Sequence, residues 1–528
     1  MRHTLECSRC VELSVDKMKV YKNEEFTLVN AKTTYRMQPQ RSLALFLCVS
    51  VTCFLLILAG ILTICFSKDI YESIMSTQMV LKPDNSAYNM WVKNPVPVSL
   101  TLYMFNWTNP EEVYNKSSKP RFEQLGPYVY RETKEKTDIV WNDNNTVTFK
   151  NVKKWWFDQE KSKGSLYDPI TSVNPVTLSA AHALRNWHVG FKMLFSGSIR
   201  AIFNNIYSTH SVGEVLFDGY SDTLLTSAAK MSLLPKGMDK FGWFYGRNGS
   251  SDFDGIFNMK TGVDGDLGVL EKWKFADHTG FYPDQCGEFK GASAGDFFPR
   301  KLTKNSVIKM FTSDLCRYME LEFYEEVVIN NIVGYKFIAG EKFLDNGTKI
   351  PENKCFCDGD CMPSGALNVS NCRHGSPAFV SLPHFYKADP YYLDLVDGLN
   401  PQEDLHQFYM VFEPTTGIPL SVAARLQLNL RMAPVPGISI FENVPTAFIP
   451  VLYFEQKVDI PDQMTFMIKV LINFDLICLL VGIGLMVVAS ISFLVVFYTM
   501  WSKKVFRKKR QNVHIVRAPA QEEVPLNH

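Results

Sequence analysis

Two long apolar runs, one near each end of the chain, dominate its hydropathy pattern. Residues 42–66 and 476–501 contain 25 and 26 residues without a charged side chain. A helix needs about 20 apolar residues to cross the hydrocarbon core of a bilayer, so each run predicts a transmembrane helix. A buried core helix is the alternative for either run, but so long an uncharged stretch disfavours it. A cleavable signal peptide is disfavoured for the first run, because its apolar region is too long and begins too far from the N-terminus.

Between these runs, residues 67–475 show the periodicity of β-structure. Arg425–Met432 alternates polar and apolar residues without error, as a strand with one buried face does. Residues 138–149 predict a hairpin with a turn at 142–145, and residues 327–343 are rich in β-branched and aromatic side chains. Long helical crossovers are scarce, so we expect an antiparallel sheet within one large ectodomain.

Residues 176–195 are the exception, because they predict a helix. Asn174 and Pro175 provide an N-cap and a first helical residue. No Asp or Glu occurs from 169 to 213. A helix over 176–195 would place four basic or titratable side chains along one stripe: His182, Arg185, His188 and Lys192.

With Arg200, these residues predict a cationic surface for an anionic head group, an oxidised lipid or an acidic partner. The alternative is an ordinary solvated helix face. If His182 and His188 are exposed, their protonation would make binding depend on pH.

Charge orients the two predicted membrane helices. Residues 502–528 carry seven basic and two acidic residues, residues 1–41 also have a basic excess, and residues 67–475 are net acidic. The positive-inside rule then predicts cytosolic tails at 1–41 and 502–528, transmembrane helices at 42–66 and 476–501, and an ectodomain at 67–475. The whole chain, with 55 basic and 54 acidic residues, lacks the basic excess of a nucleic-acid-binding protein.

Six N-x-S/T sequons agree with export of the central segment, because all of them fall within it. We expect glycosylation at Asn106, Asn115, Asn144, Asn248, Asn346 and Asn368.

Six of the twelve cysteines also lie in the central segment. An even number in an oxidising compartment predicts three disulfides, although sequence alone does not choose the pairing. A zinc site at Cys355, Cys357, Cys361 and Cys372 is the alternative, disfavoured by the absence of a CxxC pair among them. We expect neither metal nor cofactor. The tail residues Cys7 and Cys10 form a CxxC motif whose lipidation stays open.

One motif suggests catalysis. Residues 291–295 match the G-x-S-x-G nucleophile elbow around Ser293. That motif requires a strand before it and a helix after it, and Pro299 would break such a helix. We therefore predict that the protein is not an enzyme, and that His384 and His406 are structural.

Several segments together resemble the class B scavenger receptor family, also called the fatty-acid-translocase family. The resemblance covers nearly all of 67–475 and both predicted membrane helices. It rests on Gly126–Glu132 (GPYVYRE), Gly334–Asn346 (GYKFIAGEKFLDN), Gly375–Pro390 (GSPAFVSLPHFYKADP), Glu413–Met432 (EPTTGIPLSVAARLQLNLRM) and Phe448–Glu455 (FIPVLYFE). Val212–Asp222 departs from the family pattern, with Phe217 where the family has Trp and with Asp218 inserted before Gly219.

The resemblance implies an α+β membrane protein in which two transmembrane helices anchor one ectodomain. That ectodomain would have an antiparallel β-barrel core, a helical apex containing residues 169–213, and a hydrophobic tunnel. The family's cysteine spacing implies the pairs Cys286–Cys355, Cys316–Cys372 and Cys357–Cys361.

The implied function is a receptor that captures lipid or lipoprotein ligands at the apex and passes lipid through the tunnel to the membrane. An endosomal or lysosomal carrier, or an adhesion receptor for a protein bound at the apical helices, is the alternative. We expect the plasma membrane as the location, with an endosomal or lysosomal membrane as the alternative.

Overall fold

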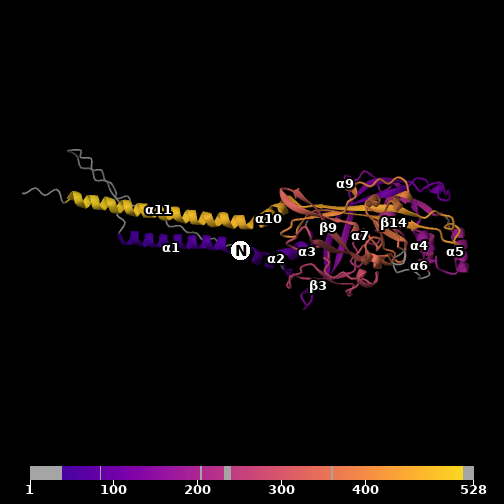
Figure 1. Cartoon of the computed structure of the whole chain (residues 1–528), viewed down its shortest axis with the longest axis horizontal. Helices are drawn as coiled ribbons and strands as arrows, with labels where there is room; N and C mark the ends of the chain where they lie inside the picture. The colour runs from indigo at the N-terminus through magenta and orange to yellow at the C-terminus, as the bar shows by residue number, and fades with distance from the viewer. Residues whose placement is uncertain are drawn as a thin grey trace, which may run out of the picture. The chain divides into compact units, whose positions relative to one another are not determined.

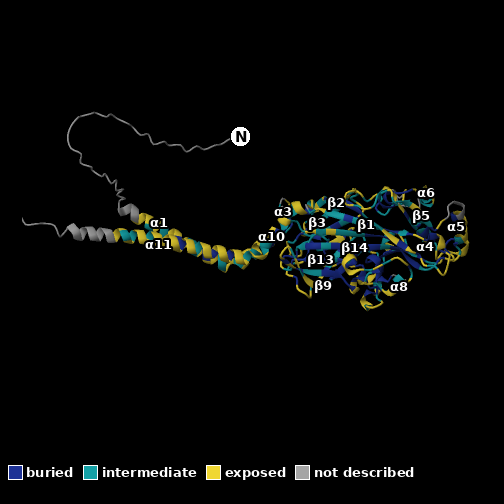
Figure 2. Ribbon diagram, turned by 90° about the horizontal axis from the view of Figure 1, so that it is seen from above, coloured by how far each residue is buried: buried dark blue, intermediate teal, exposed yellow. Residues whose placement is uncertain are grey.

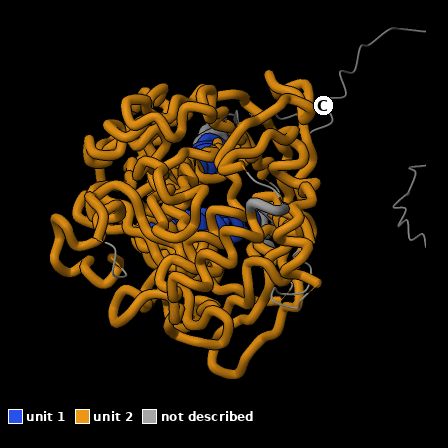
Figure 3. The backbone as a smooth tube through the Cα atoms, turned by 90° about the vertical axis from the view of Figure 1, so that its right-hand side faces the viewer, with its two compact units in different colours: residues 1–62, 481–528 blue, residues 63–480 orange. Residues whose placement is uncertain are grey.

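The computed structural model describes residues 39–514 except 84, 95, 203–204, 231–238 and 358–360. These residues form two compact units, one of residues 63–480 and one from the two ends of the chain (Figure 3). The expectations for Cys7, Cys10 and most of both tails lie outside the described residues.

Two helices in the described chain are long and apolar enough to cross a membrane: α1 (Pro39–Cys65) and α11 (Phe474–His514). Their apolar side chains point outward, as Phe54 does at 65% exposure. Such a surface is stable only against lipid, so the chain is a membrane protein. The two helices approach closely at Gly60, where a Cβ atom would lie 2.7 Å from the carbonyl oxygen of Gly482. Small residues commonly allow this approach between membrane helices.

The larger unit is built on one large sheet (Figure 1). The sheet has 13 strands, all paired antiparallel, and eleven of them follow the order β7-β6-β3-β2-β1-β15-β14-β13-β10-β9-β8. The other two are β12, which pairs with β14, and β11, which pairs with β12. The bounds are β1 Val98–Trp107, β2 Phe122–Trp141, β3 Thr146–Phe157, β6 Ile256–Lys260, β7 Leu270–Trp273, β8 Val307–Thr312, β9 Arg317–Ile329, β10 Ile332–Ala339, β11 Ala366–Asn368, β12 Ala378–Ser381, β13 Tyr409–Phe412, β14 Pro419–Met432 and β15 Ala447–Asp459. A separate pair joins β4 (Pro169–Val173) to β5 (Tyr207–Ser211).

The segment 291–295 closes most of the gap between the two ends of this sheet. Ser293 forms bridges with Val269, beside β7, and with Met310 of β8. The backbone N–H of Leu270 donates to Ala292 O at 2.8 Å on one side. The sheet is therefore a nearly closed antiparallel barrel, and the glycine-rich segment forms part of its wall.

At the middle of the sheet, β1 pairs with β15, which joins the first strand of the barrel to the last. Met104 lies opposite Leu452, and Ser99 lies opposite Lys457. Most of the buried apolar residues form one cluster around these central strands (Figure 2).

Two of the sequence predictions for strands can be compared with these ladders. The hairpin is confirmed, because β2 and β3 pair on either side of a turn at 142–145. The strand at 425–432 is confirmed as part of β14, but its polar face is buried. Gln427 and Asn429 have no exposed surface. Their polar atoms are hydrogen-bonded inside the protein instead: Gln427 accepts from His384 N at 2.7 Å, and Asn429 donates to Ser381 Oγ at 3.0 Å.

The longer helices of this unit gather at its two ends (Figures 1 and 2). At the end where the chain enters and leaves lie α2 (Ser67–Gln78), α3 (Ser86–Val92) and α10 (Asp462–Ile472). At the opposite end, here called the helical end, lie α4 (Pro175–Ala183), α5 (Val189–Ile202) and α6 (Thr223–Lys230). Shorter helices are α7 Glu341–Leu344, α8 Pro390–Asp394 and α9 Glu403–His406.

The prediction of one continuous helix over 176–195 was wrong. Helix α4 begins as expected, with the Asn174 side chain accepting from two backbone N–H groups, but it ends at Ala183. The chain turns through 184–188, and α5 begins at Val189. The His188 ring accepts a hydrogen bond from Gly190 N at 3.2 Å, which caps the new helix and stabilises the break.

Candidate ligand cavity

A cavity of about 580 Å³ lies inside the barrel. Alternate residues of neighbouring strands line it, including Leu426 and Leu428 of β14 and Leu452 and Phe454 of β15. This is the period of a strand, whose alternate side chains point to one face. The volume lies within the range of small-molecule binding sites, which are mostly apolar with a few polar groups.

Helices close the cavity toward the helical end. Val176 and Ala180 of α4 line it, together with Leu224 and Leu225 of α6. Because Asn174 fixes the start of α4 directly after β4, the same local sequence signals that make the helix also aim its apolar side chains at the cavity.

A cluster of aromatic side chains supports the cavity wall near Asp218, the residue at which the sequence departs from the family pattern. Residues Glu214–Asp218 form a π-helical turn, a conformation that accommodates one extra residue. Phe217 packs there against Tyr130 and Phe244, with ring centroids 4.6 and 5.0 Å away. The inserted residue and the replacement of Trp by Phe are thus absorbed beside the cavity without disrupting its wall.

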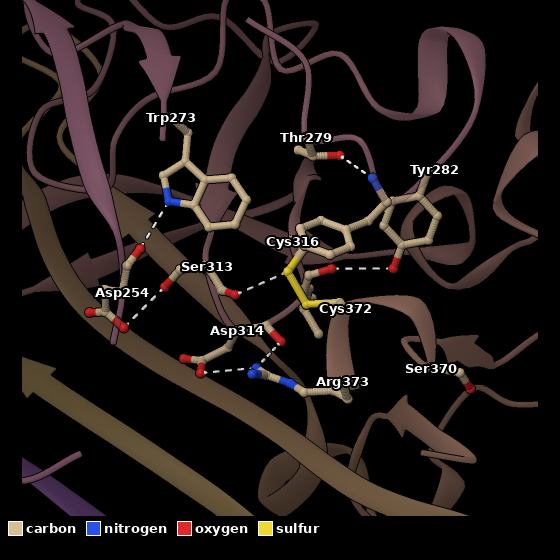
Figure 4. Close-up of a disulfide and its surroundings, with 12 residues drawn as sticks. Asp254, Trp273, Thr279, Tyr282, Ser313, Asp314, Cys316, Ser370, Cys372 and Arg373 are labelled. Carbon is tan, nitrogen blue, oxygen red and sulfur yellow. Dashed lines mark hydrogen bonds and ion pairs between the residues drawn. A yellow bond between two sulfur atoms is a disulfide. The ribbon is translucent and has the colours of Figure 1, made fainter. Parts of the chain in front are cut away.

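One wall of the cavity carries charges. Lys153 Nζ lies 2.8 Å from Asp254, and Arg247 Nη2 lies 2.8 Å from Asp314. Arg373 Nη2 also contacts Asp314: it lies 3.4 Å from the Asp314 carboxylate and donates to the Asp314 backbone oxygen (Figure 4). Burial raises the pKa of Asp314, but the cations of Arg247, Lys153 and Arg373 outweigh burial and hold that pKa well below its usual range. The carboxylate therefore stays ionised at neutral pH.

The same wall includes Glu132 of β2. Its carboxylate accepts from Trp155 Nε1 at 2.8 Å and from Gln456 Nε2 at 2.7 Å. Sequence analysis did not identify these wall residues, because they come from five separate segments and no local motif marks them.

The described chain contains three disulfides, one of which lies beside this wall. They join Cys286 to Cys355, Cys316 to Cys372, and Cys357 to Cys361, with Cα atoms 5.7, 6.0 and 4.8 Å apart. This is the pairing that the family resemblance implied, and the Cα separations are usual for disulfides. The Cys316–Cys372 bond lies directly beside Asp314 and Arg373 (Figure 4). The cysteines considered for zinc are all bonded to one another or to Cys286 and Cys316.

The residues predicted to bind ligands lie at the helical end but do not line the described cavity. Arg185 Nη1 donates to His182 O at 2.9 Å, and Lys192 Nζ donates to Arg185 O at 3.4 Å. Arg185 and His188 are exposed in the turn between α4 and α5. The predicted stripe of basic side chains along one helix is thus replaced by a cluster of basic side chains around the turn between α4 and α5. Arg200 belongs to α5, and its side chain lies outside the described residues.

Exposed apolar residues accompany this cationic cluster. On and beside α5 the exposed fractions are 56% for Trp187, 60% for Phe191 and 71% for Leu194. The sequence analysis noted only the charges of this segment and missed its apolar surface.

The sequons differ in accessibility. Asn115 and Asn144 are exposed. Asn248 is exposed too, although its side chain is hydrogen-bonded to the backbone of Trp155. Asn106 and Asn368 are partly buried. Asn346 is 3% exposed and donates to Met362 O at 2.9 Å, which leaves no room for a glycan in this conformation.

Ser293 has a structural role in the described chain. Its hydroxyl donates to Phe297 O at 2.5 Å and accepts from Gly295 N at 2.9 Å. Both of its hydrogen-bonding functions are thus used within a buried turn, which gives the G-x-S-x-G motif a reason other than catalysis.

His384 and His406 form a buried pair with stacked rings, 4.3 Å between centroids. Backbone N–H groups of Asn400 and Gln402 donate to their Nδ1 atoms at 3.0 and 2.9 Å, as neutral rings require. Burial lowers the pKa of His384 to about 4. Burial, with the neighbouring His384 and Arg425, lowers the pKa of His406 to about 3.

These features define a class of membrane protein in which terminal membrane helices flank a large β-barrel domain with an apolar cavity. Residues 51–500 match the CD36 family model, and the chain belongs to the CD36 family. It is 37% identical over 407 residues to Protein peste of Drosophila melanogaster, a match that covers 75% of this chain and 72% of that protein.

Two other relatives have informative names. Scavenger receptor class B member 1 of Rattus norvegicus is 33% identical over 404 residues, 75% of this chain and 78% of the receptor. Lysosome membrane protein 2 of Homo sapiens is 31% identical over 424 residues, 78% of this chain and 85% of that protein. The family thus includes proteins named as receptors.

Proposed function

We propose that this protein is a scavenger-type receptor that captures hydrophobic or anionic lipids or lipoproteins at its helical end and passes lipid through the barrel to the membrane. The observation that carries the proposal is the largely apolar cavity in a barrel closed by α4 and α6. A lipid moving through water is penalised by about 25 cal/mol for each Å² of apolar surface, and an enclosed apolar route removes that penalty.

Blocking the cavity tests the proposal. Ala180→Trp places an indole in the cavity from α4, whereas Ala183→Trp places it on the exposed side of the same helix. Mass spectrometry of lipids that copurify with the full-length protein should show an approximately tenfold loss for Ala180→Trp alone. Equal lipid content in both variants and the wild type would contradict the role of the cavity.

Capture at the helical end rests on the cationic cluster and its apolar neighbours. Replacement of Arg185, Lys192 and Arg200 by Glu should weaken binding of vesicles rich in anionic lipid, more at low salt than at high salt. Surface expression serves as the control for folding. If the triple variant bound these vesicles as the wild type does throughout pH 5 to 7.4, capture would have to occur elsewhere on the protein.

A carrier or adhesion receptor for a protein partner is the second candidate. The exposed side chains of Trp187, Phe191 and Leu194 favour it, because aromatic and large apolar residues are common at the centres of protein interfaces. A purified protein that retains no lipid but binds a protein through these residues would support this candidate over lipid transport.

For topology, we propose cytosolic tails at 1–41 and 502–528, transmembrane helices at 42–66 and 476–501, and an exported domain at 67–475. The plasma membrane is the proposed location, with an endosomal or lysosomal membrane as the alternative. An N-terminal tag should be inaccessible on intact cells, and enzymatic deglycosylation should lower the apparent mass. Detection of the tag from outside would refute this topology.

A further inference from the structure

We propose that the tip of the β9–β10 hairpin and helix α10 form a wedge that inserts into the lipid of the protein's own membrane. The wedge consists of residues 327–334 of the hairpin and Asp462–Ile472 of α10. This inference goes beyond the proposed function, because it concerns how the barrel unit rests on the bilayer and holds whether or not the barrel carries lipid.

The hairpin tip and α10 pack together as one piece. Ile332 of β10 and Ile468 of α10 are both buried, and they belong to the same apolar cluster. Asn330 Nδ2 also donates to Thr465 Oγ1 at 3.5 Å. The two elements therefore meet any surface together.

Helix α10 is apolar on the side that faces away from this contact. Phe466 and Met467 lie on that side with 69% and 60% of their surface exposed, and Val470 follows them one turn later. Thr465 and Ile468, on the other side, are buried. A helix that is apolar all round is normally buried in a core or in a membrane. The described residues leave the outer side of α10 uncovered, so lipid is the environment that it fits.

The hairpin tip exposes apolar side chains on its opposite face. Val328 and Val333 are cross-strand partners that are 68% and 54% exposed, and the next pair toward the turn is Ile329 with Ile332. Successive cross-strand pairs point to opposite faces of a β-ribbon, so Val328 and Val333 point away from Ile332 and from α10. The wedge is thus apolar on both of its outer sides. A folded protein partner covers one side of such a wedge, whereas lipid surrounds it and covers both.

The position of the wedge in the chain places it next to a bilayer. Helix α10 ends at Ile472, and the membrane helix α11 begins at Phe474, with only Asn473 between them (Figure 1). The exposed apolar surface of α10 is therefore continuous along the chain with a surface that already lies in lipid.

Polar groups limit how deeply the wedge inserts. Asn330 and Asn331 form the exposed turn of the hairpin, and a polar amide is costly in hydrocarbon. Glu326 is exposed two residues before Val328, about 7 Å away at the rise of a strand. The wedge therefore suits the boundary between head groups and acyl chains, where amphipathic segments bury their apolar side by about 5–10 Å.

Photocrosslinking of the full-length protein in nanodiscs tests the inference. The probe p-benzoylphenylalanine replaces either Phe466 of α10 or Val328 of the hairpin, and the nanodiscs contain phosphatidylcholine with deuterated acyl chains. Mass spectrometry should find deuterated lipid adducts at both positions, at least about tenfold above the yield at position 167. Tyr167 is the matched control, because it is an aromatic residue that is 89% exposed but lies in the loop before β4, outside the wedge.

A second experiment tests whether the two elements insert together. Phe466→Asp combined with Met467→Asp puts two charges on the outer side of α10. With the probe at position 328, the yield of deuterated adducts should then fall at least about threefold. Leu405→Asp, at a residue that is 54% exposed and lies outside the wedge, should leave that yield unchanged. All these residues are exposed, so the variants should fold, and surface expression checks that they do.

Three outcomes would overturn the inference. The first is the absence of deuterated adducts at positions 466 and 328, or the presence there only of unlabelled lipid that copurified with the barrel. The second is crosslinking between two copies of the chain, which would make this surface a dimer interface. The third is an unchanged yield at position 328 in the charged α10 variant. None of these outcomes alters the amount of copurified lipid that tests the proposed function, so the two failures are distinguishable.

Discussion

The stacked pair of His384 and His406 should make the folded protein sensitive to acid. The pKa values in the folded state are about 4 and about 3, whereas an unfolded histidine titrates near ~6.5. As the pH falls below about 6.5, the unfolded chain takes up protons that the folded chain cannot, so stability decreases until the folded pKa is reached. Between pH 7 and pH 5 each histidine should therefore cost about 2 kcal/mol, and the pair about 4 kcal/mol.

Thermal unfolding of the full-length protein at pH 7 and pH 5 measures this loss. An unfolding entropy of about 2 cal/mol/K per residue, over a domain of roughly 400 residues, converts about 4 kcal/mol into a fall of about 5 °C in Tm. Replacing both histidines by Asn removes the titration. Asn suits position 384, where φ is 53°, because it tolerates left-handed backbone.

The quantity to compare is the fall in Tm between pH 7 and pH 5, because the double variant loses packing at every pH. That fall should be about 5 °C smaller in the double variant than in the wild type. His374→Asn is the control: His374 is exposed, with φ of 55°, and should leave the fall unchanged. An equal fall in the double variant and the wild type would refute the reasoning, because it would mean that the pair titrates alike in the folded and unfolded states.

Three further predictions concern the disulfides, the glycans and a buried ion pair. Peptide mapping without reduction should recover Cys316 linked to Cys372, and loss of this bond should cost about 2–5 kcal/mol and impair export; a link from Cys316 to another cysteine would contradict the pairing. Glycopeptide analysis should find Asn115 modified and Asn346 unmodified, since only the first is exposed; a glycan on Asn346 in folded protein would show that this loop adopts another conformation. Asp296→Ala should destabilise the protein by about 3–5 kcal/mol, because it leaves the buried Lys136, whose Nζ lies 2.6 Å from Asp296, without that carboxylate. Chemical denaturation measures the effect, with Asp252→Asn as the control, because Asp252 is paired with Lys150 but is 81% exposed. Equal stability of the two variants would refute the prediction.

The sequence predicted those parts of the fold that depend on short-range patterns. The membrane helices follow from uncharged runs, and the β2–β3 hairpin follows from a turn rich in Asn and Asp between apolar arms. The end of α4 could not be predicted in the same way. His188 caps α5 through a ring nitrogen, and neither the spacing nor the helix propensity of residues 176–195 signals that contact.

The cavity wall depends on long-range contacts that no single segment encodes. Arg247 and Asp314 lie 67 residues apart in the chain, and Glu132 is bonded to a residue 324 positions away. The alternation of β14 predicted a buried face and an exposed face, but tertiary packing buried both, so the polar side chains of Gln427 and Asn429 serve as internal hydrogen-bonding groups.

The pairing of β1 with β15 has a consequence for the order in which the protein can be completed during synthesis. Met104 and its partner Leu452 are separated by 348 residues, the difference of their numbers. At about 5–20 residues per second, β1 emerges roughly 20 to 70 s before its partner strand. During that interval one edge of β1 has no neighbour, and Leu102 and Met104, which are fully buried in the finished protein, lack the neighbours that β15 provides. Exposed strand edges promote association between chains, so the nascent protein is most vulnerable to aggregation before the last strand of its barrel has been made.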